Sequence, residues 1–463
     1  MADDATAEES PSAGPQEITE LFRPFFDAFC QSSDAFDLDC LYRFLNNGSR
    51  PALTPGFETS QLENAFQHFL GTATQPHLLH FLEFLTANIE RAAPCPILPS
   101  HFELGERLLL TEKLEALWKK NFSVLTLEES DEWKPFTNLQ VAALMVVNLD
   151  ILRRAAWGGN RFSDLMAALC VIPVLTKTLL TSPKRKGHDG RLDRANYVCT
   201  FTDVAHTGRC RIVPYTSTNK TQEELEILGQ QMRIASSVLF GDSGETCVGE
   251  RLTQAEDLFA SKLAINDKEV WNKINMSLQL VVWWDHCRFG LKYVDATACT
   301  PEDNKPAGTI KVKLQWHWMP TKVNDVEPLG RARPEFLVAF VEANGDPTAF
   351  GDEGFIAEAR PRSGRLIRTG DIFYTYVAGE HVEKMKLALE IQWVLVRLAV
   401  IAGGLTVVKQ ASSDGLDFLT KNGSFPGSLH VANAAIFGDA GVGGVSEGKE
   451  GDIKGKGKKC SVM

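Results

Sequence analysis

The sequence predicts an α+β fold, with an α-helical N-terminal region followed by a domain that contains several strands. Apolar residues recur at helical spacing from Ile18 to Leu180, which indicates a series of helices. From Gly308 to Trp318 apolar and polar residues alternate, as in a strand with one buried side and one solvent-facing side. A second strand is expected from Ile372 to Tyr376. A long apolar helix is expected from His381 to Ala402, ended by Gly403-Gly404.

Composition and charge place the chain among ordinary globular proteins. Of the 463 residues 44% are hydrophobic and 23% are charged, which is enough to bury a sizeable core. The formal net charge of −11 excludes a protein that coats DNA through its overall charge. Ten cysteines form no Cys-x-x-Cys pair, and the first twenty residues are too acidic and polar for a signal peptide. We therefore expect reduced thiols in the cytoplasm, with the nucleus as the alternative.

The chain divides into five predicted segments. These are a disordered acidic tail at 1–15, a helical region at 16–182, a basic linker at 183–195, a strand-containing domain at 196–405 and a flexible Gly/Lys-rich tail at 438–463. Capping boxes at Ser60-x-x-Glu63 and Thr221-x-x-Glu224 each predict the start of a helix. Further helices of the N-terminal region are expected at 76–91, 111–120, 138–157 and 162–180. A scaffold for the second domain is the expected role of this region.

The predicted linker carries a cluster of basic side chains. Its members are Lys184, Arg185, Lys186, Arg191 and Arg194. Backbone phosphates of nucleic acid suit such a cluster, which makes nucleic acid a candidate partner. A nuclear-import signal is a second interpretation, and a solvated loop between domains is a third.

Two later segments carry motifs that point to one family. The stretch from Tyr197 to Pro214 has the outline of a β-hairpin, with Thr207-Gly208 as its turn. Cys199-x-x-Thr202 opens this stretch, and a second segment begins at Asn275 and continues into Trp284-Asp285. Two further matches are Leu314-Gln-Trp-His-Trp-Met-Pro320 and Gln392-Trp393. In these motifs, from about residue 196 to residue 403, the chain resembles the fungal HNH-endonuclease-like family.

The resemblance implies a ββα core with a helical insertion and additional strands, and it implies two catalytic positions. In an HNH nuclease a first histidine is the general base, a last histidine holds part of a divalent ion, and an asparagine fixes the loop. Here Arg211 takes the place of the first histidine, and no histidine lies between Asn275 and Trp284, where the resemblance places the last one. A guanidinium has no lone pair to accept a proton, although it can bind a phosphate with two hydrogen bonds. Asn275 is at the asparagine position; a capping or turn asparagine is the alternative.

Two functions follow from the resemblance. One is a binding or regulatory module whose nuclease centre has decayed. The other is an active metal-dependent HNH endonuclease that hydrolyses nucleic-acid phosphodiesters with Mg²⁺, Mn²⁺ or Zn²⁺, for which Asp285 and His286 would be replacement ligands. The missing base favours the first. Cys199, Cys210 and Cys287 have no zinc-knuckle spacing, so we expect buried free thiols.

The last residues carry a separate signal. Cys460-Ser-Val-Met463 has the form of a prenylation box, in which methionine favours a farnesyl group. Four lysines precede it between 454 and 459, and basic residues beside a lipid strengthen attachment to an anionic membrane. A prenylated Cys460 at the inner face of a membrane is therefore expected. The alternative is a chance cysteine in a lysine-rich tail.

Overall fold

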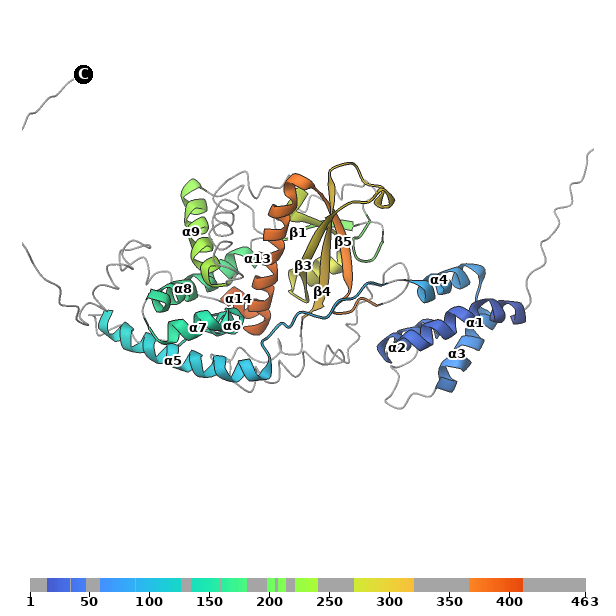
Figure 1. Ribbon diagram of the computed structural model, residues 1–463, viewed down its shortest axis with the longest axis horizontal. Coiled ribbons are helices and arrows are strands. Elements are labelled where there is room, and N and C mark those ends of the chain that lie inside the picture. The colour runs from blue at the N-terminus through green and yellow to red at the C-terminus, as the bar shows by residue number, and fades with distance from the viewer. Residues whose placement is uncertain are drawn as a thin grey trace, which may run out of the picture.

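The computed structural model describes residues 15–33, 35–46, 59–87, 89–125, 135–158, 160–180, 198–204, 207–213, 221–239, 270–319 and 366–410. Within these ranges helices and small antiparallel sheets make an α+β protein, which confirms the predicted fold class (Figure 1). Residues 1–14 of the predicted acidic tail, the five basic residues from Lys184 to Arg194, and the tail with Cys460 lie outside the described residues.

The first four helices bury a core of their own. They are α1 (Pro15–Ser32), α2 (Ala35–Leu45), α3 (Thr59–Thr72) and α4 (Gln75–Thr86). Phenylalanines fill their interface, for example Phe26 and Phe66, whose ring centroids are 4.1 Å apart. The helix start predicted at Ser60 is within one residue of the start of α3, and both carboxylate oxygens of Glu63 accept hydrogen bonds of 2.7 Å from Arg23 on α1. The helix expected to reach residue 91 ends at Thr86.

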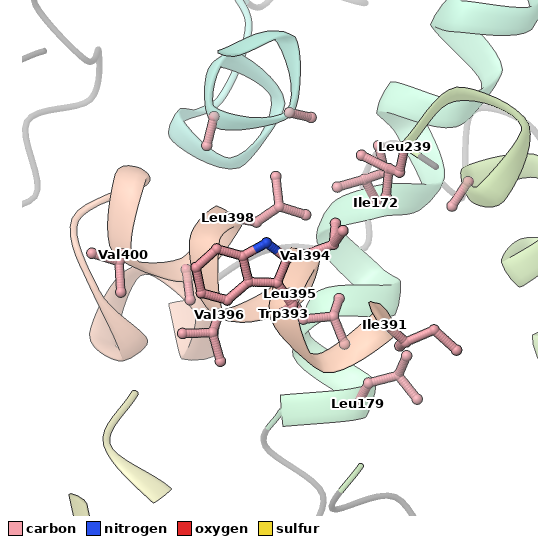
Figure 2. Close-up of a cluster of buried hydrophobic side chains, with 14 of the residues drawn as sticks. Ile172, Leu179, Leu239, Ile391, Trp393, Val394, Leu395, Val396, Leu398 and Val400 are labelled. Carbon is pink, nitrogen blue, oxygen red and sulfur yellow. The ribbon is translucent and has the colours of Figure 1, made fainter. Parts of the chain in front are cut away.

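Most of the other helices pack into a second, larger core. They are α5 (His101–Leu125), α6 (Asn138–Val146), α7 (Leu149–Ala156), α8 (Asn160–Leu180), α9 (Gln222–Leu239), α13 (Val382–Ile401) and α14 (Leu405–Gln410). Figure 2 shows part of this core, where apolar side chains of α13 such as Ile391 and Leu395 lie against Ile172 and Leu179 of α8. The predicted region 16–182 thus contributes to two separate cores.

Several local signals act as expected in these helices. Thr221 and Glu224 form the predicted capping box at the start of α9, with hydrogen bonds of 2.8 and 3.1 Å. Gly403 and Gly404 end α13 with φ angles of 105° and 95°, values that favour glycine. The single helix expected over 138–157 is instead α6 and α7, because Asn148 leaves helical geometry and its side chain caps α7.

Among the described helices, one is long and apolar enough by length and composition to cross a membrane. It spans Arg161–Leu180, and 67% of its most apolar window is buried inside the fold.

A three-stranded antiparallel sheet lies beside α13 (Figure 1). Its order is β3 (Phe289–Ala298), β4 (Thr309–Trp318) and β5 (Ile372–Ala378), so both strands predicted from alternation are present. The prediction that the polar side of β4 faces solvent is wrong at the end of the strand, where Gln315 and His317 are buried. The reason is tertiary: the Trp393 ring of α13 lies 4.7 Å from His317, and Gln315 donates to the carbonyls of Ala92 and Ala93.

A second sheet has two strands, β1 (Thr207–Arg211) and β2 (Lys273–Ser277), followed at once by α11 (Leu278–Asp285). The hairpin predicted within 197–214 is therefore wrong. Thr207 and Gly208 are the first residues of β1, which pairs with β2, and not a turn. The chain reverses earlier, between Cys199 and Val204, where Cys199 N–H donates to the Val204 carbonyl over 3.0 Å. Short 3-10 turns occupy Val270–Asn272, Pro301–Asp303 and Gly379–His381.

Candidate functional site

The two motif segments that carry Arg211 and Asn275 come together in the unit formed by β1, β2 and α11, which we call the ββα unit. Ser277 ends β2 and caps α11, because its hydroxyl accepts the Leu280 N–H over 3.4 Å. Leu280 and Trp284 are buried on the inner side of α11. The Trp284 indole N–H donates to the Arg211 carbonyl over 3.1 Å, which fastens the end of the helix to the end of β1.

The register of β1 and β2 divides their side chains between two faces. Residues directly opposite in an antiparallel pair project to the same side. Cys210 pairs with Ile274 on the inner face, where both are buried. On the other face the pairs are Thr207 with Ser277, Arg209 with Asn275 and Arg211 with Lys273. Thr207 is buried, whereas the four residues of the last two pairs, which we call the basic ribbon, are exposed or half-buried and hold three positive charges.

Two of the basic ribbon residues were missed by the sequence analysis. Arg209 and Lys273 each lie two positions from a motif residue, Arg211 and Asn275 respectively, so strand periodicity places them on the same side. The signal was present in the sequence, but the pairing of two strands more than sixty residues apart was needed to join the halves. Asn275 itself lies in the middle of β2 and not at a strand start, which removes the capping interpretation.

A third residue missed from the sequence, Asn272, holds the end of β1 in place. Its side chain is 2% exposed. The amide oxygen accepts the Val213 N–H over 2.9 Å, and the amide nitrogen donates to the Val213 carbonyl over 3.1 Å. A buried amide that satisfies both backbone groups two residues after Arg211 fixes the path of the chain there. No local sequence pattern predicts this contact, because the two partners are 59 positions apart in the chain.

Three cysteines around the ββα unit are free and buried, as predicted: Cys199, Cys210 and Cys287. The Cys199 sulfur accepts the Ser277 N–H over 3.3 Å, which ties the turn at 199–204 to the start of α11. Burial, and next the charge of Asp285, raises the pKa of Cys287 to about 12. Since zinc binds the thiolate form, Cys287 is a poor ligand in this environment.

The pair predicted as replacement metal ligands is found at the end of α11. Asp285 is the last residue of α11, and His286 follows as its C-cap. The Nδ1 of His286 donates to the Val282 carbonyl over 2.7 Å, so only Nε2 is left to bind an ion. In the described part of the chain no three His, Cys, Asp or Glu side chains are grouped closely enough to hold a metal.

His317, in the motif strand β4, is inside the fold and away from solvent. Its Nε2 lies 2.9 Å from the Gln315 amide oxygen, while the Gln315 amide nitrogen donates to two backbone carbonyls. The amide oxygen can only accept, so Nε2 carries the imidazole proton. Burial, followed by the charges of Lys292 and Arg397, lowers the pKa of His317 to about 3. The side chain is a neutral structural group.

Comparisons with known proteins add no relative. No protein-family model, curated protein or solved structure matches this chain.

Proposed function

We propose that the ββα unit is a nuclease-like core that binds the phosphate backbone of nucleic acid without hydrolysing it. The single observation behind this is the basic ribbon, in which the register of β1 and β2 brings Arg209, Arg211 and Lys273 to one face. The order of two antiparallel strands and a helix is the order that the resemblance to HNH endonucleases implies. The net charge of −11 then confines binding of a polyanion to a local surface such as this one.

The chemistry of the basic ribbon supports binding over cleavage. Arg211 is where the resemblance expects a general base, yet a guanidinium remains protonated and cannot take a proton from water. The same group presents two parallel N–H donors, which match two phosphate oxygens. Asn275, opposite Arg209, adds an amide that can donate to a phosphate or a sugar. Phosphate contacts of this kind position a nucleic acid and do not read its sequence.

Binding of labelled oligonucleotides over a series of salt concentrations tests this proposal. Each lost phosphate contact lowers the slope of log K against log salt by about 0.9 on duplex DNA and about 0.7 on single strands. We expect Arg209→Gln, Arg211→Gln and Lys273→Gln each to weaken binding and reduce the slope. Arg153→Gln is the matched control, because Arg153 is an exposed arginine on α7 that pairs with Glu106. If all four variants bind the oligonucleotides with the same affinity as the unmodified protein, the basic ribbon is not the nucleic-acid binding site.

A cleavage assay separates the two functions that the resemblance implies. Plasmid DNA is incubated with the protein and Mg²⁺, Mn²⁺ or Zn²⁺, and nicking is followed on a gel. The binding module leaves the plasmid intact with every ion. Nicking that disappears in an Asn275→Ala variant would instead establish an active endonuclease.

A further inference from the structure

In the described part of the chain, charged contacts outnumber buried apolar ones at the junction between the two cores. Among the described buried residues, the core of α1–α4 contains a single member from outside those helices, Leu366. In Figure 1 the four helices lie apart from the rest, and the chain after α4 runs back along the three-stranded sheet. A small polar junction between separately packed cores is typical of domains that move relative to each other.

Among the residues that the structure describes, four charged side chains meet at this junction. Arg91 donates to both oxygens of Asp37 on α2, over 2.9 and 3.1 Å, and through Nε to Asp371 over 2.9 Å. Arg368 lies 3.6 Å from Asp37, and its backbone N–H donates to Asp371 over 2.9 Å. Asp37 and Asp371 are almost fully buried, with side chains 6% and 1% exposed. We call Asp37, Arg91, Arg368 and Asp371 the ion latch.

Backbone hydrogen bonds flank the ion latch on both sides. Ala92 N–H donates to the Gly370 carbonyl over 3.0 Å, and Ile372 N–H donates to the Glu90 carbonyl over 2.9 Å. The segment 89–93 is thereby held along the start of β5, and the Glu90 carboxylate contacts Lys313 and Tyr374 on the sheet. These bonds and the Arg91–Asp371 pair hold the same segment against the sheet, so they open together when that segment leaves the sheet.

We propose that the ion latch is a release device that docks α1–α4, as a separately folded unit, onto the sheet. Two arginines and two carboxylates neutralise each other in the docked state. The free-energy cost of removing such charges from water nearly cancels the energy of their attraction. The docked and released states are therefore close in free energy. Since the unit keeps its own phenylalanine core, opening the latch frees the unit without unfolding it. This inference is independent of the phosphate-binding proposal.

Hydrogen exchange of the full chain, read by mass spectrometry, tests the device. Asp37→Asn removes the charge that joins α2 to Arg91, and we expect amide exchange at Ala92 and Ile372 to become at least about tenfold faster. Arg91→Lys keeps the charge but can no longer reach two carboxylates at once. We expect amide exchange at Ala92 and Ile372 in this variant to be faster than in the unmodified protein and slower than in Asp37→Asn. Asp39→Asn is the matched control, because Asp39 is on the same helix and pairs with Arg43 one turn further along it.

Protection inside the unit distinguishes release from unfolding. The amides of Phe66 and Phe69 in α3 lie in the core of α1–α4. Release leaves their exchange in Asp37→Asn as slow as in the unmodified protein. Unchanged exchange at Ala92 and Ile372 in Asp37→Asn would overturn the proposal. Faster exchange at Phe66 and Phe69 as well as at Ala92 and Ile372 would also overturn it, because the unit would then unfold. If Asp37→Asn does not accumulate as folded protein, Arg91→Lys alone carries the same two readouts.

Discussion

The burial of His317 predicts that acid destabilises the larger core before most carboxylates titrate. The folded protein holds this imidazole neutral, with a pKa of about 3 against 6.5 as its ordinary value. Between these two pH values the unfolded chain binds a proton that the folded chain does not. The free energy of unfolding therefore rises with pH across this window, and the contribution of His317 is lost as the pH falls from about 6.5 toward 3.

The magnitude follows from the gap between the two pKa values. One pH unit corresponds to about 1.4 kcal/mol per proton, so lowering the pH to about 4.5 costs about 3 kcal/mol and the whole window about 5 kcal/mol at most. His317→Gln removes the titrating group, and its amide nitrogen can still donate to Gln315 from the place of Nε2. We expect its unfolding free energy to depend less steeply on pH, by up to about 1.4 kcal/mol per unit between about pH 4 and 6.

Urea denaturation followed by tryptophan fluorescence measures this dependence for the larger core. All nine tryptophans lie beyond residue 117, so the unit of α1–α4 is silent in this signal. Substitution of the exposed His286 by glutamine controls for the loss of a histidine as such. If His317→Gln and the unmodified protein have the same slope of unfolding free energy against pH, the His317 imidazole does not set the acid sensitivity of the larger core.

Two further predictions concern a buried hydrogen bond and the packing around a glycine. Asn272→Ala should lower the unfolding free energy by about 2–4 kcal/mol in urea denaturation, because the buried N–H and carbonyl of Val213 lose their partners; a change under about 0.5 kcal/mol would contradict this. Gly290→Ala should cost about 1–3 kcal/mol in thermal unfolding, since the new Cβ would lie 3.0 Å from the Trp393 ring. Gly105→Ala, a helical glycine with nothing within 4 Å, should instead stabilise by about 0.5–1 kcal/mol, and a loss in both variants would refute the packing argument.

Local signals in the sequence determined the elements themselves. The capping box at Thr221, the alternation along β4 and Gly403-Gly404 after α13 all act within a few residues, and the helix start, the strand and the helix end that they predict are present. Such signals depend on backbone geometry and on the spacing of apolar residues, and both are properties of residues close together in the chain. The α+β class follows from them because it needs only the order of helices and strands.

The candidate site was decided by tertiary structure. β1 found its partner in β2 and not in its own hairpin, and only that pairing joins Arg209 and Arg211 to Lys273. Asn272 acts across 59 positions, and His317 is buried because a distant helix covers its strand. Contacts between residues far apart in the chain cannot be predicted from a local period or spacing. The packing of the whole chain therefore decides which charged groups meet and which face of a strand is exposed to solvent.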